Sequence, residues 1–148
     1  MGNRKPTNAN EATRQPWLLI AEDDDDIRTA LTELFTRDGF AVASVCDGEL
    51  LLQCLQSCEQ HFWLPDAIVT DHRMPMYSSI DVIRRMNARG LKVPVILITA
   101  FGAEVRELAT ALGARAVLDK PFDAAELRTE VICSIDWTHR RLASTSEP

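Results

Sequence analysis

Five short apolar runs alternate with helical patterns along this chain, and this alternation restricts its fold more than any other feature. The runs lie at residues 17–21, 40–45, 66–71, 93–99 and 114–119 and consist mainly of Val, Ile, Leu and Ala, as strands buried on both faces do. Between them, apolar residues recur three and four positions apart, as on one face of a helix. The alternation predicts an α/β domain in which helices cover both faces of a parallel sheet.

Polar residues and glycines mark where the predicted helices begin and end. Asp24 is expected to cap the first helix, and Asp47 opens the second. Asp123, with Glu126 three residues later, predicts a capping box at the last helix. Three helices are expected to end at glycines, which adopt the left-handed conformation common at helix C-termini, namely Gly39, Gly90 and Gly113.

The sequence indicates a single domain over residues 17–137, because a chain of 148 residues is about one domain long. Residues 1–16 lack the apolar core of a signal peptide and are interpreted as a disordered polar leader. Residues 138–148 are interpreted as a polar tail without an apolar period. No apolar run approaches the ~20 residues of a membrane-spanning helix, so we expect a cytoplasmic protein without membrane contact.

Composition argues against nucleic acid as a direct partner. The formal net charge is −6, and Lys and Arg are scattered, whereas binding to a phosphate backbone needs them clustered. The four cysteines are interpreted as reduced thiols, because a disulfide-stapled secreted domain would be shorter and richer in cysteine. Cys54, Cys58 and His61 follow one another closely. We interpret them as helix-packing residues rather than as a zinc site, which needs a fourth ligand.

Chemically reactive side chains follow four of the predicted strands, each where the strand ends. Glu22 and Asp23 follow the first run, and Asp71 ends the third. Thr99 ends the fourth run, and Lys120 follows the fifth. In open parallel sheets, ligands bind beyond the carboxyl ends of the strands. A doubly wound, flavodoxin-like (βα)5 sheet in the order 2-1-3-4-5 places the first and third strands side by side, so the acids are expected to share one pocket.

This grouping predicts phosphoryl-transfer chemistry supported by a divalent cation. Three carboxylates in one crevice repel one another unless a cation lies among them, and Mg²⁺ (or Mn²⁺) prefers oxygen ligands. Lys120 adds a positive charge suited to a phosphoryl oxygen, and Thr99 offers a hydroxyl donor to another. Asp71 is then the nucleophile that forms an acyl phosphate.

Four segments resemble a known family. The stretches LLIAEDDDDIR, AIVTDHRMP, VILITAF and LDKPF, in this order, resemble the receiver domain of two-component response regulators over about residues 17–137. The resemblance implies that Asp71 is the phosphoacceptor, charged by a phosphohistidine on a sensor histidine kinase or a histidine phosphotransfer protein. It also implies a signalling module rather than an enzyme, apart from self-catalysed phosphorylation and dephosphorylation.

The resemblance also implies a set of metal ligands. Glu22 and Asp23 match the family's acidic pair, with Asp23 as the more direct ligand and Glu22 acting partly through water. Asp71 and the backbone carbonyl of Arg73 complete the ligands that the protein supplies to Mg²⁺.

Switching is the second property that the resemblance implies. Thr99 and Lys120 match the switch hydroxyl and the phosphate-binding lysine, and the Lys120–Pro121 bond is expected to be cis. Phosphorylation is then expected to shift a two-state equilibrium, so that a surface on the fourth helix, fifth strand and fifth helix binds a downstream protein or a second copy.

This chain departs from the family pattern at three positions. Ser79 stands where a glycine is usual, and Val117 stands where the family often has a switch aromatic. The first acid is Glu22 rather than an aspartate, a longer arm that still serves the metal. His72, next to the acceptor, is expected to be a solvent-facing residue at the rim of the site.

Three other functions are weighed against this one. An Mg²⁺-dependent phosphohydrolase typically carries a second acid two residues after its nucleophile, where this chain has Arg73. A nucleotide- or flavin-binding module would carry Gly, Ser or Thr after the first strand, whereas the sequence AEDDDD found there repels phosphate. A degenerate receiver, which acts by protein binding without phosphorylation, is disfavoured because the five reactive side chains are all present.

Overall fold

The computed structural model of the chain describes residues 14–145, with the side chains of residues 14–135. Residues 1–13 of the predicted leader lie outside the described residues, as do residues 146–148 of the predicted tail. Within the described range, five strands alternate with five helices, as the sequence pattern predicts.

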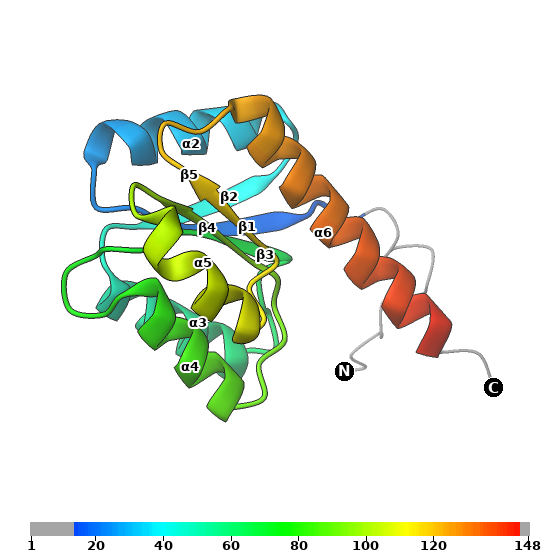
Figure 1. Cartoon of the computed structure of the whole chain (residues 1–148). Coiled ribbons are helices and arrows are strands. Elements are labelled where there is room, and N and C mark those ends of the chain that lie inside the picture. Colours follow the sequence, from blue (N-terminus) through cyan, green and yellow to red (C-terminus); the bar gives the residue numbers. More distant parts are fainter. Residues whose placement is uncertain (1–13, 146–148) are drawn as a thin grey trace.

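The strands form one parallel sheet in the order β2-β1-β3-β4-β5, which confirms the predicted flavodoxin-like arrangement (Figure 1). They are β1 (Trp17–Ala21), β2 (Ala41–Val45), β3 (Ala67–Asp71), β4 (Val95–Thr99) and β5 (Ala116–Asp119). In the register, Ala21 pairs with Thr70 and Thr99 pairs with Asp119. The carboxyl ends of the strands that carry the reactive side chains therefore lie along one edge of the sheet.

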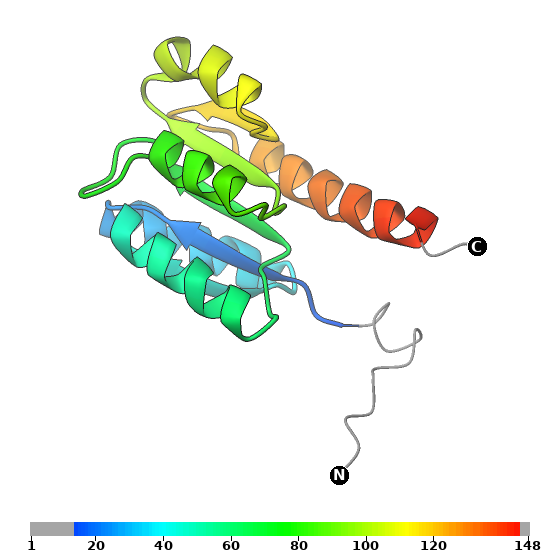
Figure 2. The same ribbon diagram turned by 90° about the horizontal axis from the view of Figure 1, so that it is seen from below.

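Helices cover both faces of the sheet (Figure 1, Figure 2). One face carries α2 (Asp25–Arg37) and α6 (Ala124–Thr145), and the other carries α3 (Gly48–Gln60), α4 (Ser79–Ala88) and α5 (Gly102–Ala111). Each face has its own apolar core. Phe35 and Leu127 belong to the first, and Leu51 and Ala109 to the second; all four are fully buried.

The predicted helix starts are confirmed by side-chain hydrogen bonds. Asp24 Oδ1 accepts from the backbone N–H of Asp26 at 2.9 Å, and Asp47 Oδ1 accepts from Leu50 N–H at 2.7 Å. At α6, Asp123 Oδ1 accepts from Ala125 N–H at 2.7 Å, but the predicted capping box with Glu126 is not among the hydrogen bonds of the described residues. The three predicted glycine stops follow their helices with positive φ angles, at Gly39 (94°), Gly90 (69°) and Gly113 (100°).

The structure corrects both predicted ends of the domain. Residues 14–16 are held by the domain rather than belonging to a leader: Arg14 pairs with Asp66 at 3.2 Å, and Pro16 O accepts from Ala41 N–H at 3.0 Å. At the other end, α6 continues through residues 138–145, which the sequence analysis assigns to a tail. The reason is local, because this segment contains neither Gly nor Pro to end the helix.

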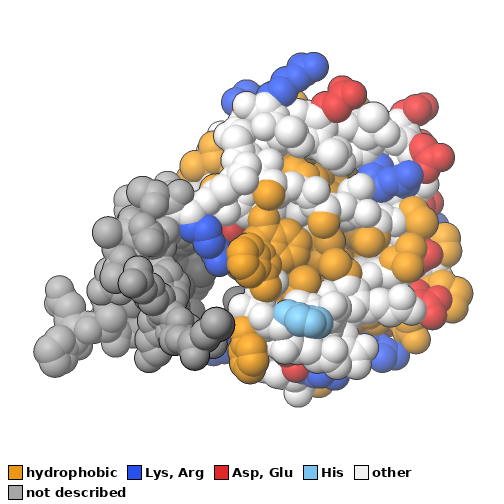
Figure 3. Space-filling view, turned by 180° about the vertical axis from the view of Figure 1, so that it is seen from behind, with side chains coloured by type: hydrophobic (Ala, Val, Ile, Leu, Met, Phe, Trp, Pro, Cys, Tyr) orange, Lys and Arg blue, Asp and Glu red, His pale blue; other side chains and the backbone are white. Residues whose placement is uncertain are grey.

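The face opposite that of Figure 1 carries a group of apolar side chains beside Lys and Arg side chains (Figure 3). A pocket of about 570 Å³ is lined by Trp17, Ala41, Cys58, His61 and Trp63 among others. Burial raises the pKa of the Cys58 thiol to about 11, so this thiol stays protonated at neutral pH.

Among the helices of residues 14–145, none combines the length and the hydrophobicity of a membrane span.

Candidate functional site

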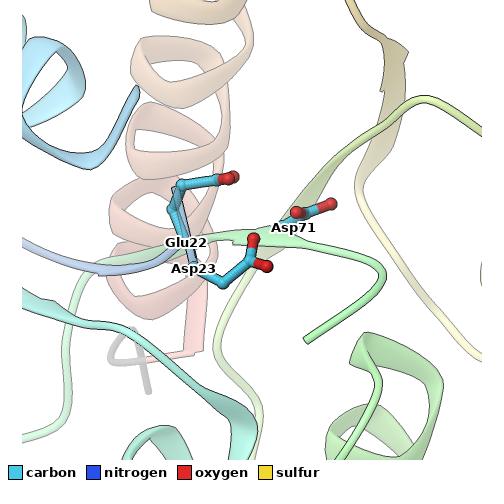
Figure 4. A group of neighbouring side chains, drawn as sticks. All are labelled: Glu22, Asp23 and Asp71. Atoms are coloured by element: carbon cyan, nitrogen blue, oxygen red, sulfur yellow. The ribbon is translucent and has the colours of Figure 1, made fainter. Parts of the chain in front are cut away.

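Three acids meet at the carboxyl edge of the sheet. Glu22 and Asp23 come from the loop after β1 and Asp71 from the end of β3, and their carboxylates lie near one another (Figure 4). One carboxylate oxygen of each lies within 4.8 Å of the others, which is close enough for one cation to touch all three. Within the described part of the chain, this is the one group of three or more His, Cys, Asp and Glu side chains with such spacing.

Lys120 reaches the same point from the loop after β5. Its Nζ donates to Asp71 Oδ2 at 3.1 Å and lies 3.2 Å from both carboxylate oxygens of Glu22. Its backbone N–H donates to Thr99 O at 2.7 Å, which joins the ends of β4 and β5. The Lys120–Pro121 bond is cis, as the sequence resemblance implies.

The acids are held in an environment that disfavours negative charge. Glu22 is fully buried, and its pKa rises to about 7, first because of burial and then because of the Asp71 carboxylate, although Lys120 opposes both. Burial also raises the pKa of Asp71, against the opposing effect of Lys120. Burial acts to lower the pKa of Lys120, but its contacts with Asp71 and Glu22 outweigh burial and raise it. One lysine therefore compensates these acids only in part, and a further cation is favourable.

Arg28 holds the acidic pair in place, a role that was not predicted from the sequence. Its Nη1 donates to the backbone carbonyl of Glu22 at 3.0 Å, and its Nη2 pairs with Asp25 at 2.5 Å. Arg28 lies in the first turns of α2, so the guanidinium bridges the start of this helix and the loop before it. A basic residue six positions after Glu22 was the only signal in the sequence, and it does not identify the contact.

Thr99 is fully buried at the end of β4. Its Oγ1 accepts a hydrogen bond from Phe101 N–H at 2.9 Å, so its hydroxyl is joined to the loop that leads into α5. This contact links Thr99 to the start of α5, and the backbone bond from Lys120 links it to the end of β5.

Arg73 follows the acceptor by two residues, and its side chain contacts residues that come after β4. The acidic pair lies on the other side of β3, after β1. The Arg73 guanidinium stacks 3.6 Å from the centroid of the Phe101 ring, and its Nη2 lies 3.6 Å from Glu104 Oε2. The side chain thus connects the β3–α4 loop with the start of α5, and both partners are partly exposed.

The prediction that His72 faces solvent is wrong. The side chain is half-buried, and its Nδ1 lies 2.8 Å from Ser79 Oγ. Burial, followed by the nearby charge of Arg73, lowers the pKa of His72. Ser79 is fully buried as the first residue of α4. The residue with positive φ in this loop is Met76, at 74°, so the serine is not strained at the position where the family has glycine.

Val117, at the position where the family often has an aromatic residue, is a buried strand residue. Its backbone carbonyl accepts from Arg106 Nη1 at 2.6 Å, and Arg106 Nη2 pairs with Asp119 at 3.0 Å. A charged side chain of α5 therefore lies against β5 next to Lys120.

The sheet order and the acid–lysine cluster at its carboxyl edge place the chain among flavodoxin-like signalling domains. The sequence model of the response regulator receiver domain matches residues 18–132, and the chain belongs to this family. Its fold and sequence features are those of a receiver domain of two-component response regulators, which is a signalling domain that interacts with histidine kinases.

Individual relatives agree with this assignment. The chain is 30% identical over 115 residues to sporulation initiation phosphotransferase F of Bacillus subtilis (strain 168), covering 77% of this chain and 89% of that protein. It is 34% identical over 112 residues to regulatory protein AtoC of Escherichia coli (strain K12), covering 74% of this chain but 23% of AtoC. The receiver domain of the Francisella response regulator 1452 is similar with a TM-score of 0.77 and 26% identity, covering 84% of this chain and 99% of that one.

The relatives differ in length. The chain spans 53% of the transcriptional regulatory protein FixJ of Azorhizobium caulinodans, to which it is 32% identical, and a smaller share of AtoC. The similarity to these longer regulators therefore concerns their receiver domains.

Proposed function

We propose that this receiver domain accepts a phosphoryl group on Asp71 from a phosphohistidine of a sensor histidine kinase or histidine phosphotransfer protein. The observation that carries the proposal is the contact of Lys120 Nζ with Asp71 Oδ2 at 3.1 Å, beside two further carboxylates within 4.8 Å. A nucleophilic carboxylate, a cation for the phosphoryl oxygens and ligands for a metal are thus assembled at one point.

The site fits Mg²⁺ (or Mn²⁺). Its ligands would be the carboxylates of Glu22, Asp23 and Asp71 together with the backbone carbonyl of Arg73, which are the hard oxygen donors that these ions prefer. A bound dication supplies positive charge to the phosphoryl oxygens as negative charge develops on them. The raised pKa of Glu22 supports this assignment, because a carboxylate that is costly to ionise alone is stabilised by a metal.

Several residues of the chain then have separate roles in phosphoryl transfer. An Asp71 carboxylate oxygen forms the new bond to phosphorus while the bond from phosphorus to the donor imidazole breaks. The imidazole nitrogen leaves with the bonding electron pair and takes up a proton. Lys120 binds a phosphoryl oxygen, and the Thr99 hydroxyl, whose oxygen accepts from Phe101 N–H, donates its own O–H to a second oxygen.

The signal is read on the surface formed by α5, β5 and α6, which we call the output face. Thr99 and Lys120 lie at the ends of β4 and β5, so their contacts with phosphate bear directly on this face. Leu108 and Ile132 of α5 and α6 are 42% and 45% exposed, and offer apolar area to a downstream protein or a second copy. The net charge of −6 disfavours direct contact with nucleic acid. Four free cysteines accord with a cytoplasmic location.

The test is modification of the protein by acetyl phosphate in the presence of Mg²⁺. We expect one acid-stable, base-labile phosphate per chain, detected by intact mass and by a phosphate-retarding gel. Asp71→Asn should abolish it, whereas Asp26→Asn, which removes an exposed acid in the first turn of α2, should leave it unchanged. A wild-type protein that takes up no phosphate but still binds a partner would instead support the degenerate receiver.

A further inference from the structure

His72 and Ser79 close the base of the loop that follows the phosphoacceptor. Ser79 N–H donates to the backbone carbonyl of His72 at 2.9 Å, and the side chains meet at 2.8 Å between Nδ1 and Oγ. His72 N–H donates in turn to Ile98 O of β4 at 3.3 Å. Residues 73–78 are therefore a closed loop whose two ends are joined by one backbone bond and one side-chain bond.

The α4 end of this closure is rigid. Ser78 and Asp81 form a capping box at the helix start, with Ser78 Oγ accepting from Asp81 N–H at 3.3 Å. Ser79 follows as the first helical residue and is fully buried. The hydroxyl of Ser79 is buried with it, and the ring of His72 is its hydrogen-bond partner.

The tip of the loop is anchored separately, against the start of α3. Gly48 N–H donates to Pro75 O at 3.3 Å, and a Cβ at Gly48 would lie 2.1 Å from Tyr77 O. The loop is thus held at its tip by α3 and at its base by the contact between His72 and Ser79. Arg73, whose carbonyl is a proposed metal ligand, follows His72 directly along the chain.

We propose that His72 is a positioning residue for phosphotransfer to Asp71, acting through its bond to Ser79. The inference rests on the proposed function and deepens it. His72 lies between Asp71 and Arg73 in the sequence. Its imidazole forms its hydrogen bond with Ser79 of α4 rather than with a carboxylate of the site. The bond fixes the peptide between the acceptor and the metal-binding carbonyl before the metal arrives, which is the preorganisation that a metal site needs.

The contact also explains what the serine contributes to this chain. Glycine at position 79 would keep the backbone bond to His72 O but would have no hydroxyl for the imidazole. The side-chain bond therefore belongs to the pair His72–Ser79, and removing either partner should have the same effect on the loop. Because one hydrogen bond is lost in both cases, we expect the Mg²⁺ affinity to fall about fivefold in either variant.

The experiment measures Mg²⁺ affinity by calorimetry and the rate of phosphorylation by acetyl phosphate over a range of Mg²⁺ concentrations. His72→Ala and Ser79→Ala should each require about fivefold more Mg²⁺ for half-maximal rate, and approach the wild-type rate at saturation. The double variant should be no worse than either single one, since both remove the same bond. His72→Asn, whose amide can still reach the serine hydroxyl, should recover most of the affinity.

His61→Ala is the matched control, because His61 Nδ1 also makes a 2.8 Å hydrogen bond, to Ser57 O, but at the end of α3. Wild-type behaviour of His72→Ala, or additive losses in the double variant, would overturn the inference while leaving the proposed function intact. A wild-type protein that takes up no phosphate would overturn both. If His72→Ala fails to fold, the comparison of Ser79→Ala with His72→Asn decides the matter, because only the former should lose Mg²⁺ affinity.

Discussion

The ammonium of Lys120 lies 3.2 Å from both carboxylate oxygens of the fully buried Glu22. In the metal-free state, the lysine proposed to bind phosphate thus compensates an acid proposed to bind metal. The two roles conflict, because a dication near Glu22 repels Lys120. Metal binding is therefore expected to free the ammonium from Glu22 and leave it available to the phosphoryl group on Asp71.

Replacing Lys120 tests this division of roles. In Lys120→Ala we expect Mg²⁺ to bind about tenfold more tightly, because a positive charge close to the metal position is removed. Phosphorylation by acetyl phosphate should nevertheless fall by at least about tenfold, because a charge-assisted hydrogen bond to the phosphoryl group is lost. Calorimetry and intact mass measure the two effects. Lys92→Ala removes an exposed lysine and is the control; parallel losses of binding and phosphorylation would contradict the expectation.

The pKa of Glu22 predicts how the stability of the metal-free protein depends on pH. The pKa rises from 4.5 to about 7 on folding, so the folded state binds the proton more tightly than the unfolded chain. The stability from this group is fully present below pH 4.5 and is lost as the pH rises through about 7. The loss is at most about 3 kcal/mol, the free-energy equivalent of the shift.

Chemical denaturation in EDTA at pH 5, 6, 7 and 8 measures this effect. At low pH, Glu22→Gln and the wild type should have similar free energies of unfolding. Toward pH 8, the free energy of unfolding of the variant should increasingly exceed that of the wild type. The comparison with the variant is needed because the lowered pKa of His72 acts in the opposite direction. Mg²⁺ affinity of the wild type should rise over the same range, since the proton and the metal compete for Glu22. A difference between the two proteins that is independent of pH would contradict the assignment.

The positions of the reactive side chains could be predicted from the sequence because strand order determines them. In the flavodoxin-like strand order that was predicted and is observed, the ends of β1 and β3 are neighbours, and this brings Asp71 to Glu22. Caps such as Asp24 and Asp47 were predictable for a similar reason, since each bonds to a backbone group within three residues.

Contacts between distant side chains were not predictable in this way. The prediction that His72 lies at an exposed rim was wrong. Its hydrogen-bond partner, Ser79, is buried only once α4 packs on the sheet. The end of the leader was misplaced because Arg14 is held by Asp66, and such a contact leaves no periodic signal. The extent of α6 was missed because a helix that projects beyond the sheet needs no apolar face (Figure 2).

Gly102 and Asp119 give a prediction about the output face. A Cβ at Gly102 would lie 1.7 Å from Asp119 Oδ1, so Gly102→Ala should displace the carboxylate that pairs with Arg106. We expect a loss of no more than about 1 kcal/mol in the free energy of unfolding, because the displaced carboxylate is the end of a largely exposed side chain and what is lost is its ion pair with Arg106. In an Asp119→Ala background the same substitution should stabilise the protein by up to about 1 kcal/mol, because Ala is a better helix former than Gly. Thermal denaturation of the four proteins measures both values, and an equal effect in both backgrounds would contradict the clash.

Arg28 gives the last prediction, which concerns the acidic pair. Its guanidinium donates to Glu22 O at 3.0 Å while pairing with Asp25, so it fixes the peptide that carries both Glu22 and Asp23. We expect Arg28→Ala to weaken Mg²⁺ binding about fivefold, the equivalent of one hydrogen bond. Arg28→Lys should recover little, because a single ammonium cannot match the two separate donors of the guanidinium. Calorimetric Mg²⁺ titration measures the effect, and Arg37→Ala, at the far end of the same helix, is the control. Wild-type affinity in Arg28→Ala would show that the loop holds its acids in place without the guanidinium.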